Sequence, residues 1–413
     1  MSKKTKQPLQ TRVVQQEVNE EFAEFKGGLE NAIQQAKEKG FDKMFIVDTD
    51  AHQMEPFALF SKYLKEPWKK KYAKMMTQLD PDVEWYKSYQ FADGRIKRPD
   101  VSYPGPQEPD EIVREFTDLM VKIGIKKTIV LPNQMLSLGH NPLATTSKKS
   151  IESQKSGEEK KWFEFEVAVA NAYIDYMLDN FLDKYPEIVT MVYAPANSPD
   201  KAADLIDRVG SEKGVSGIMV TPIRPTLAGS NDWNPIYEAA TKKGLTISFH
   251  AQGYHGDYLK GFKKYMPAHA LSFPYYLALQ LTSIITEAVP ERYPHVKFAF
   301  MEGGLSWIPW IMQRLDSLYL VRGAVEAPML KKAPSDYIRQ FYFTSQPLEK
   351  PKNAWELEYI FRIINGETQV MYASDYPHWD FDVPSVIYNL PFLSATAKEN
   401  ILGGNAAKVY RLK

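Results

Sequence analysis

Eight short apolar segments recur along the chain, and most of them are continuously apolar rather than alternating between apolar and polar positions. Continuous apolar runs are typical of strands that are buried on both faces, as in a parallel sheet. The runs end at Asp50, Pro132, Ala194, Thr221, Ala251, Glu302, Ser345 and Asp375. We therefore predict eight strands of a parallel sheet, of which the seventh, FYFTS, has the weakest pattern.

Helical patterns separate these runs. Residues 164–185, 198–214 and 235–244 have the patterns of helices and are long enough to cross from one parallel strand to the next. Eight strand–helix units predict an α/β fold, the (β/α)8 TIM barrel. A doubly wound open sheet is the alternative, but no GxGxxG follows the first strand to favour dinucleotide binding.

Two regions fall outside this repeating pattern. Residues 11–39 have apolar positions at helical spacing, so we expect an N-terminal helical extension over residues 1–43 and the barrel over 44–413. The stretch from about 57 to 107 is rich in Tyr, Trp, Lys and Pro and is too long for an ordinary loop, which predicts an insertion after the first strand. It would form a substrate wall over the C-terminal face of the barrel, or an aromatic decoration or dimer contact.

The composition excludes several classes of protein. The 413 residues include 51 Lys and Arg against 51 Asp and Glu, and this lack of net charge argues against a nucleic-acid partner. The chain has no cysteine, which excludes disulfides, Cys-ligated metals and thiol nucleophiles. It has no apolar run of about 18 residues and no apolar segment near its start, so we expect a cytoplasmic protein without a membrane partner.

Candidate catalytic residues follow the predicted strands. Active sites of TIM barrels are built at the C-terminal ends of the strands, and four of those ends carry Asp50, His52, His250, Glu302 and Asp375. Imidazole nitrogens and carboxylate oxygens suit Zn²⁺ or Mn²⁺, with solvent or substrate in a remaining position. Taken singly, each residue has a structural alternative, because Asp often caps a turn after a strand and a lone buried His is usually satisfied by hydrogen bonds.

Several segments together resemble a known family. They are IVDTDAHQMEP, ISFHAQG, FMEGGLSWIPWIMQRLD, YFTSQPLE, ASDYPHWD and NILGGNAAKVYRL. From about Met44 to Arg411 the chain is similar to the amidohydrolase-related metalloenzymes, in the amidohydrolase 2 branch that includes aminocarboxymuconate-semialdehyde and resorcylate-type decarboxylases. The resemblance implies a distorted (β/α)8 barrel with one divalent metal ion, zinc ahead of manganese, bound by Asp50, His52, His250 and Asp375.

Further candidate residues surround this metal site. Some members of the family have His at the end of the sixth strand, where this chain has Glu302; a carboxylate there could ligate metal, accept a proton or position a carbonyl group. His378, three residues after Asp375, is a candidate for contact with substrate or with water. Arg224 and His255 follow barrel strands and are predicted to bind an anionic small-molecule substrate, with surface solvation as the alternative.

Three functions compete at this point. The leading prediction is a metal-dependent hydrolase of a small cyclic or aromatic organic acid, in which the metal activates water, Asp375 accepts its proton and Glu302 orients water or substrate. The close alternative is a metal-dependent, non-oxidative decarboxylase of an aromatic or unsaturated carboxylic acid. A barrel that binds partners without catalysis is the third. A homodimer is expected because soluble proteins commonly form C2 dimers and because the insertion is aromatic.

Overall fold

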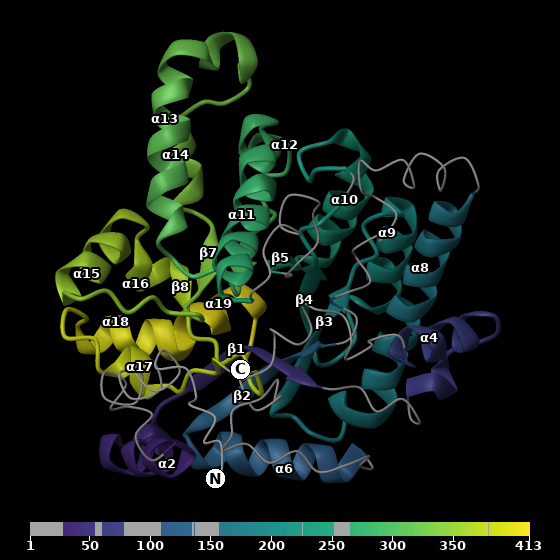
Figure 1. Ribbon diagram of the computed structural model, residues 1–413, viewed down its shortest axis with the longest axis horizontal. Coiled ribbons are helices and arrows are strands. Elements are labelled where there is room, and N and C mark those ends of the chain that lie inside the picture. The colour runs from purple at the N-terminus through teal and green to yellow at the C-terminus, as the bar shows by residue number, and fades with distance from the viewer. Residues whose placement is uncertain are drawn as a thin grey trace, which may run out of the picture.

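Eight parallel strands stand at the centre of the molecule, with helices around them (Figure 1). The computed structural model describes residues 28–53, 60–77, 109–133, 136, 157–224, 226–251, 265–378 and 380–413. The strands are β1 (Ile46–Gln53), β2 (Ile125–Pro132), β3 (Ile188–Tyr193), β4 (Val215–Val220), β5 (Thr246–His250), β6 (Phe298–Met301), β7 (Tyr342–Thr344) and β8 (Val370–Met371). Each strand pairs with the next along the chain. This order confirms the (β/α)8 barrel, and the doubly wound alternative is wrong.

The barrel closes between its last and first strands through individual backbone hydrogen bonds, in a region that we call the β8–β1 seam. The N–H of Asp375 donates to the carbonyl oxygen of Asp50 at 2.7 Å, and the N–H of His52 donates to that of Tyr376 at 2.6 Å. The sequence predicts an eighth strand as far as Asp375, but β8 ends at Met371. Asp375 has a φ of +60°, in the left-handed region, which is incompatible with extended structure.

The helices begin and end where the sequence supplies suitable residues. α9 (Pro199–Val209) has a Pro in its first turn, and α10 (Asn234–Lys243) ends at Gly244, whose φ of +63° favours glycine. The other helices are α2 (Gly28–Lys39), α4 (Trp68–Thr77), α6 (Pro109–Lys122), α8 (Glu158–Met177), α11 (Tyr265–Thr286), α12 (Val289–Arg292), α13 (Trp307–Glu326), α14 (Pro334–Ile338), α15 (Ala354–Ile363), α16 (Gly366–Gln369), α17 (Ser385–Tyr388), α18 (Ala395–Glu399) and α19 (Asn405–Tyr410). Short 3-10 or π segments are η2 (Phe41–Lys43), η3 (Ser61–Tyr63), η5 (Leu178–Leu182), η6 (Asn231–Trp233) and η8 (Asn400–Gly404).

Side chains along each strand point alternately toward the surrounding helices and into the interior of the barrel. Phe249 of β5 stacks on Phe300 of β6 with ring centroids 5.5 Å apart, and Phe300 stacks on Phe343 of β7 at 5.9 Å. Trp233, just before α10, stacks on Phe249 at 5.9 Å, so this aromatic row lies between strands and helices. Successive strand residues point to opposite faces, and His250 is therefore directed into the barrel.

Some predicted regions lie partly outside the described residues. Of the N-terminal extension, the structure describes α2 and η2, and Ala32 and Ala36 of α2 are buried in the main core. Of the predicted insertion, only residues 60–77 are described, and they form η3 and α4. Among the described helices, none combines the length and the apolar character that a membrane span requires.

Candidate metal centre

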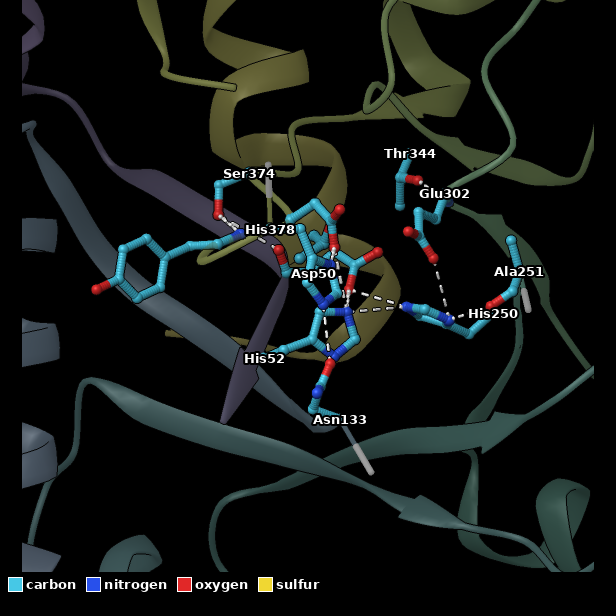
Figure 2. Close-up of polar contacts among 12 residues, drawn as sticks. Asp50, His52, Asn133, His250, Ala251, Glu302, Thr344, Ser374 and His378 are labelled. Carbon is cyan, nitrogen blue, oxygen red and sulfur yellow. Dashed lines mark hydrogen bonds and ion pairs between the residues drawn. The ribbon is translucent and has the colours of Figure 1, made fainter. Parts of the chain in front are cut away.

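Side chains from β1 and β5 converge inside the barrel (Figure 2). Asp50 and His52 lie two residues apart on β1, which places them on one face of the strand, and His250 is the last residue of β5. All three are buried. The Nε2 atom of His250 lies 3.2 Å from Nε2 of His52 and 3.2 Å from Oδ1 of Asp50, and the latter two atoms are 3.3 Å apart.

Asp375 joins this group from the β8–β1 seam. Its Oδ1 atom lies 3.2 Å from Nε2 of His52 and 2.7 Å from Nδ1 of His378. The other ring nitrogen of His378 lies 2.8 Å from Oδ1 of Asn133, which directly follows β2. The structure thus brings together five of the residues predicted from the sequence, namely Asp50, His52, His250, Asp375 and His378.

Main-chain carbonyl groups fix the tautomers of two histidines. Nδ1 of His52 lies 3.3 Å from the carbonyl oxygen of Pro132, and Nδ1 of His250 lies 2.7 Å from that of Ala251. Because a carbonyl oxygen only accepts, each Nδ1 carries a proton, and Nε2 is the ring nitrogen that faces the cluster. A cation that binds here would replace any proton on these Nε2 atoms and take up their lone pairs.

The spacing of these donors fits a single divalent cation. Ligands about 2.1 Å from a common centre lie about 3.0–3.4 Å from one another, and the three contacts among Asp50, His52 and His250 are 3.2–3.3 Å long. Asp375 contacts His52 and belongs to a second candidate ligand group, with His52 and His378. Within the described residues, the Oδ2 atoms of Asp50 and Asp375 are buried and accept no hydrogen bond. Buried carboxylate oxygens are costly unless a cation balances them. The residues therefore suit a divalent metal ion bound by nitrogen and oxygen.

The charges in the cluster favour binding of a positive ion. Burial opposes protonation of His52, but the carboxylates of Asp375 and Asp50 raise its pKa to about 10. Burial opposes ionisation of Asp375, yet the imidazoles of His378 and His52 hold its pKa below the ordinary value. The cluster therefore keeps its carboxylates ionised and attracts positive charge, for which protons and a metal ion compete.

Glu302 borders the cluster from the end of β6. It is buried, its N–H donates to the hydroxyl of Thr344 at 2.9 Å, and its Oε2 lies 3.5 Å from Nδ1 of His250. Its φ of +59° is in the left-handed region, a strained conformation that is concentrated at functional sites. Burial, reinforced by the charges of Asp375 and Asp50, raises the pKa of Glu302 well above its ordinary value.

Arg224 lies in a different buried cluster. Its guanidinium donates to Oε1 of Glu166 on α8 at 2.5 Å, and also to the hydroxyls of Tyr193 and Thr221. A guanidinium that already pairs with one carboxylate is poorly placed to bind another in bidentate geometry. Substrate binding by Arg224 stays a prediction, as does that by His255, which lies outside the described residues.

Three residues that contact the site are not predicted from the sequence. Asn133 meets His378, and Asp48 accepts hydrogen bonds from Ser374, next to Asp375. Burial raises the pKa of Asp48 to about 7. The available signal for Asp48 is its place in VDTDAH, on the same face of β1 as Asp50. Ser374 gives no comparable signal, since 326 positions separate it from Asp48.

Fold and cluster together define a (β/α)8 protein with a buried site suited to a divalent cation. A family model described as amidohydrolase matches residues 142–412. Because this match covers more than half of the chain, the protein belongs to the amidohydrolase family. The resemblance seen in its sequence motifs is confirmed.

One curated relative has a stated activity. The 2-amino-3-carboxymuconate-6-semialdehyde decarboxylase of Dictyostelium discoideum is 29% identical over 178 residues, which make up 42% of this chain and 46% of the relative. The match therefore spans less than half of the length of that relative.

Solved structures share the fold at lower identity. The 5-carboxyvanillate decarboxylase from Sphingomonas paucimobilis has a TM-score of 0.62 at 18% identity, over 90% of this chain and 100% of that one. An amidohydrolase from Mycobacterium avium subsp. paratuberculosis K-10 has a TM-score of 0.64 at 17% identity, over 89% and 98%. The dihydroxybenzoic acid decarboxylase from Polaromonas sp. JS666, solved with manganese and the inhibitor 2-nitroresorcinol, has a TM-score of 0.58 at 15% identity, over 89% and 97%.

These comparisons contradict the leading functional prediction. The curated relative is a decarboxylase, as are the 5-carboxyvanillate and dihydroxybenzoate enzymes among the similar structures, so the hydrolase predicted from the sequence is wrong. The physical reason is that a set of His and Asp ligands positions a cation equally well for either reaction. The ligand set alone therefore does not distinguish hydrolysis from decarboxylation.

Proposed function

We propose that this protein is a metal-dependent, non-oxidative decarboxylase of an aromatic or unsaturated carboxylic acid. One observation carries the proposal: the buried donors Asp50, His52 and His250 belong to a chain whose curated relative is a decarboxylase of an unsaturated acid. The names of the similar structures, 5-carboxyvanillate and dihydroxybenzoate decarboxylases, give further support for a small aromatic acid.

Asp50, His52, His250 and Asp375 would hold the metal ion. When bound, a divalent cation supplies positive charge that anchors a substrate carboxylate and stabilises negative charge developing next to it. We propose manganese rather than zinc, since two carboxylates provide hard oxygen donors and the Polaromonas decarboxylase was solved with manganese. The homodimer expected from the sequence stays a prediction.

Glu302 is the proposed proton donor. In a decarboxylation the bond between the substrate carbon and its carboxylate breaks, CO2 leaves, and the bonding electron pair stays on the carbon, which then takes up a proton. The protonated carboxyl group of Glu302 supplies that proton, and solvent reprotonates it afterwards. Glu302 is suited to this role because it borders the donor cluster without belonging to either candidate ligand group.

His378 is proposed to orient Asp375. Its Nδ1–H donates to Oδ1 of Asp375, and the side chain of Asn133 fixes the opposite edge of the ring. A hydrogen bond from a neighbouring group to a ligand carboxylate orients it and limits its motion. We therefore expect loss of His378 to disturb the orientation of Asp375.

The test is CO2 release by the manganese-loaded protein. The substrates are 2,6-dihydroxybenzoate, 5-carboxyvanillate and 2-amino-3-carboxymuconate 6-semialdehyde, and the control is the His250→Ala variant. We expect CO2 in stoichiometric amounts, with one deuterium on the former carboxylate-bearing carbon when the reaction runs in D2O. Product formed without CO2, or no turnover of any of these acids, would overturn the proposal.

A further inference from the structure

A carboxylate outside the candidate ligand set joins the two sides of the β8–β1 seam. Asp48 lies on β1 two residues before Asp50 and is fully buried. Its Oδ1 accepts the N–H of Asp50 at 3.1 Å and the N–H of Ser374 at 2.8 Å, and its Oδ2 accepts the hydroxyl of Ser374 at 2.5 Å. One carboxylate therefore holds Asp50 on one side of the seam and the neighbour of Asp375 on the other.

Ser374 extends this constraint to both sides of Asp375. Its hydroxyl donates to Asp48 and accepts the N–H of Tyr376 at 3.0 Å. Asp375 lies between Ser374 and Tyr376, and its N–H donates to the carbonyl oxygen of Asp50. The left-handed conformation of Asp375 persists only where surrounding contacts determine it, and these bonds supply such contacts.

Stability alone does not account for a carboxylate at this position. Removing an ionised group from water is costly, and the three recorded donors to Asp48, two N–H groups and one hydroxyl, are all neutral. A carboxylate nevertheless offers more acceptor sites than any neutral side chain of its size and binds its donors at short distances. Its benefit is therefore geometric precision across the seam.

We propose that Asp48 is a positioning residue of the metal site, which sets the distance between the carboxylates of Asp50 and Asp375 through its bonds to Ser374. The inference rests on the metal site of the proposed function and adds the part of the chain that holds the site in shape. Residues that orient metal ligands typically change metal affinity about 10–100-fold when they are replaced.

The seam itself provides a matched control. Thr49 lies next to Asp48, is buried, and donates its hydroxyl across the seam to the carbonyl oxygen of Tyr372 at 2.7 Å. Thr49→Val removes that hydrogen bond without removing any bond to Asp50, Ser374 or Asp375. A variant that weakens the seam alone is thereby separated from variants that release the ligands.

The experiment measures binding of Mn²⁺ itself to the full-length protein. Asp48→Asn, Ser374→Ala, Ser374→Thr and Thr49→Val are compared with wild type by electron paramagnetic resonance, which counts free Mn²⁺ and reports the symmetry around bound Mn²⁺. We expect Asp48→Asn and Ser374→Ala to weaken binding about 10–100-fold and to change the spectrum of the bound ion. Thr49→Val should keep both at wild-type values, and Ser374→Thr, which retains the hydroxyl, should recover them.

The outcomes separate the positioning role of Asp48 from the proposed metal-dependent function. Unchanged affinity and spectrum in Asp48→Asn and Ser374→Ala overturn the positioning role, as does an equal loss in Thr49→Val. Loss of the folded circular dichroism spectrum in both site variants also overturns it, because the role is then structural. Wild-type protein that binds neither Mn²⁺ nor Zn²⁺ refutes the proposed function instead.

Discussion

The imidazole rings of His52 and His250 meet edge to face, with ring centroids 5.0 Å apart and an angle of 89° between the ring planes. A main-chain carbonyl group at each Nδ1 holds this orientation. Both Nε2 atoms therefore point into the cluster before any cation binds. This preorganisation reduces the conformational entropy that the two side chains would lose on binding. At the scale of the residue, the site is prepared for its ligand.

Removing one of these rings should abolish metal binding. We expect wild-type protein, purified without added metal, to hold about one zinc or manganese ion per chain, and His250→Ala to lose it. His295→Ala, at an exposed histidine before β6, is the control and should retain the metal. Plasma mass spectrometry provides the measurement, and metal retained by His250→Ala would exclude the site.

Glu302→Gln tests the proton donor. Glutamine keeps the shape of the side chain but is no acid, so kcat should fall by about 10²–10⁴-fold, the usual contribution of a general acid. Metal content should stay at the wild-type value, because Glu302 lies outside both candidate ligand groups. Near-normal kcat in this variant would show that the proton comes from another group.

At the scale of the element, buried side chains tie α8 to the strands beside it. Glu166 of α8 contacts Tyr193 at the end of β3 and Arg224 after β4. The same carboxylate accepts a hydrogen bond from Asn197 at 3.0 Å. Glu166 and Arg224 thus pair with one another and with neighbouring polar side chains, as expected of a structural cluster.

Arg224→Ala should therefore act on stability. Removing one partner of a buried ion pair typically costs about 3–5 kcal/mol, whereas Arg208→Ala, which breaks the exposed pair with Asp175 between α9 and α8, should cost about 0–1 kcal/mol. Urea unfolding gives both values. If Arg224 instead binds substrate, its replacement raises KM and leaves the free energy of unfolding nearly unchanged.

Two adjacent glycines in η8 have opposite requirements. A Cβ on Gly403 would lie 1.8 Å from the carbonyl oxygen of Phe45, just before β1, whereas a Cβ on Gly404 would meet nothing closer than the side chain of Asn400 at 3.2 Å. Gly403→Ala should destabilise the fold by about 1–3 kcal/mol or more through overpacking. Gly404→Ala should be neutral or stabilising by up to about 1 kcal/mol. Thermal unfolding of the two variants distinguishes them, and equal melting temperatures would contradict the close contact.

At the scale of the whole molecule, the sequence predicts what local pattern determines. The apolar runs predict all eight strands and their order, and the ends of the predicted strands carry Asp50, His52, His250 and Asp375, although Asp375 lies beyond the end of β8. Contacts such as that of Asp48 with Ser374 join distant positions and have no local pattern. The type of reaction was predicted wrongly because the same ligands serve both chemistries.

Metal removal should weaken the entire fold. A ligand present at about 100 times its Kd stabilises the native state by about 2.7 kcal/mol, and the candidate ligands come from β1, β5 and the seam. We therefore expect EDTA to lower the melting temperature of wild-type protein and to leave His250→Ala unchanged. Calorimetry provides the measurement, and an equal shift in both proteins would place the effect of EDTA elsewhere.

Because the β8–β1 seam joins residues far apart in the sequence, the site can form only after both sides of the seam have been synthesised. Asp50 and His52 leave the ribosome before His250, and Ser374 and Asp375 emerge after it. An ion that arrived before then would meet a partial set of donors and would be held weakly. Firm capture of a metal ion would therefore wait until Asp375 has been synthesised and the seam has closed.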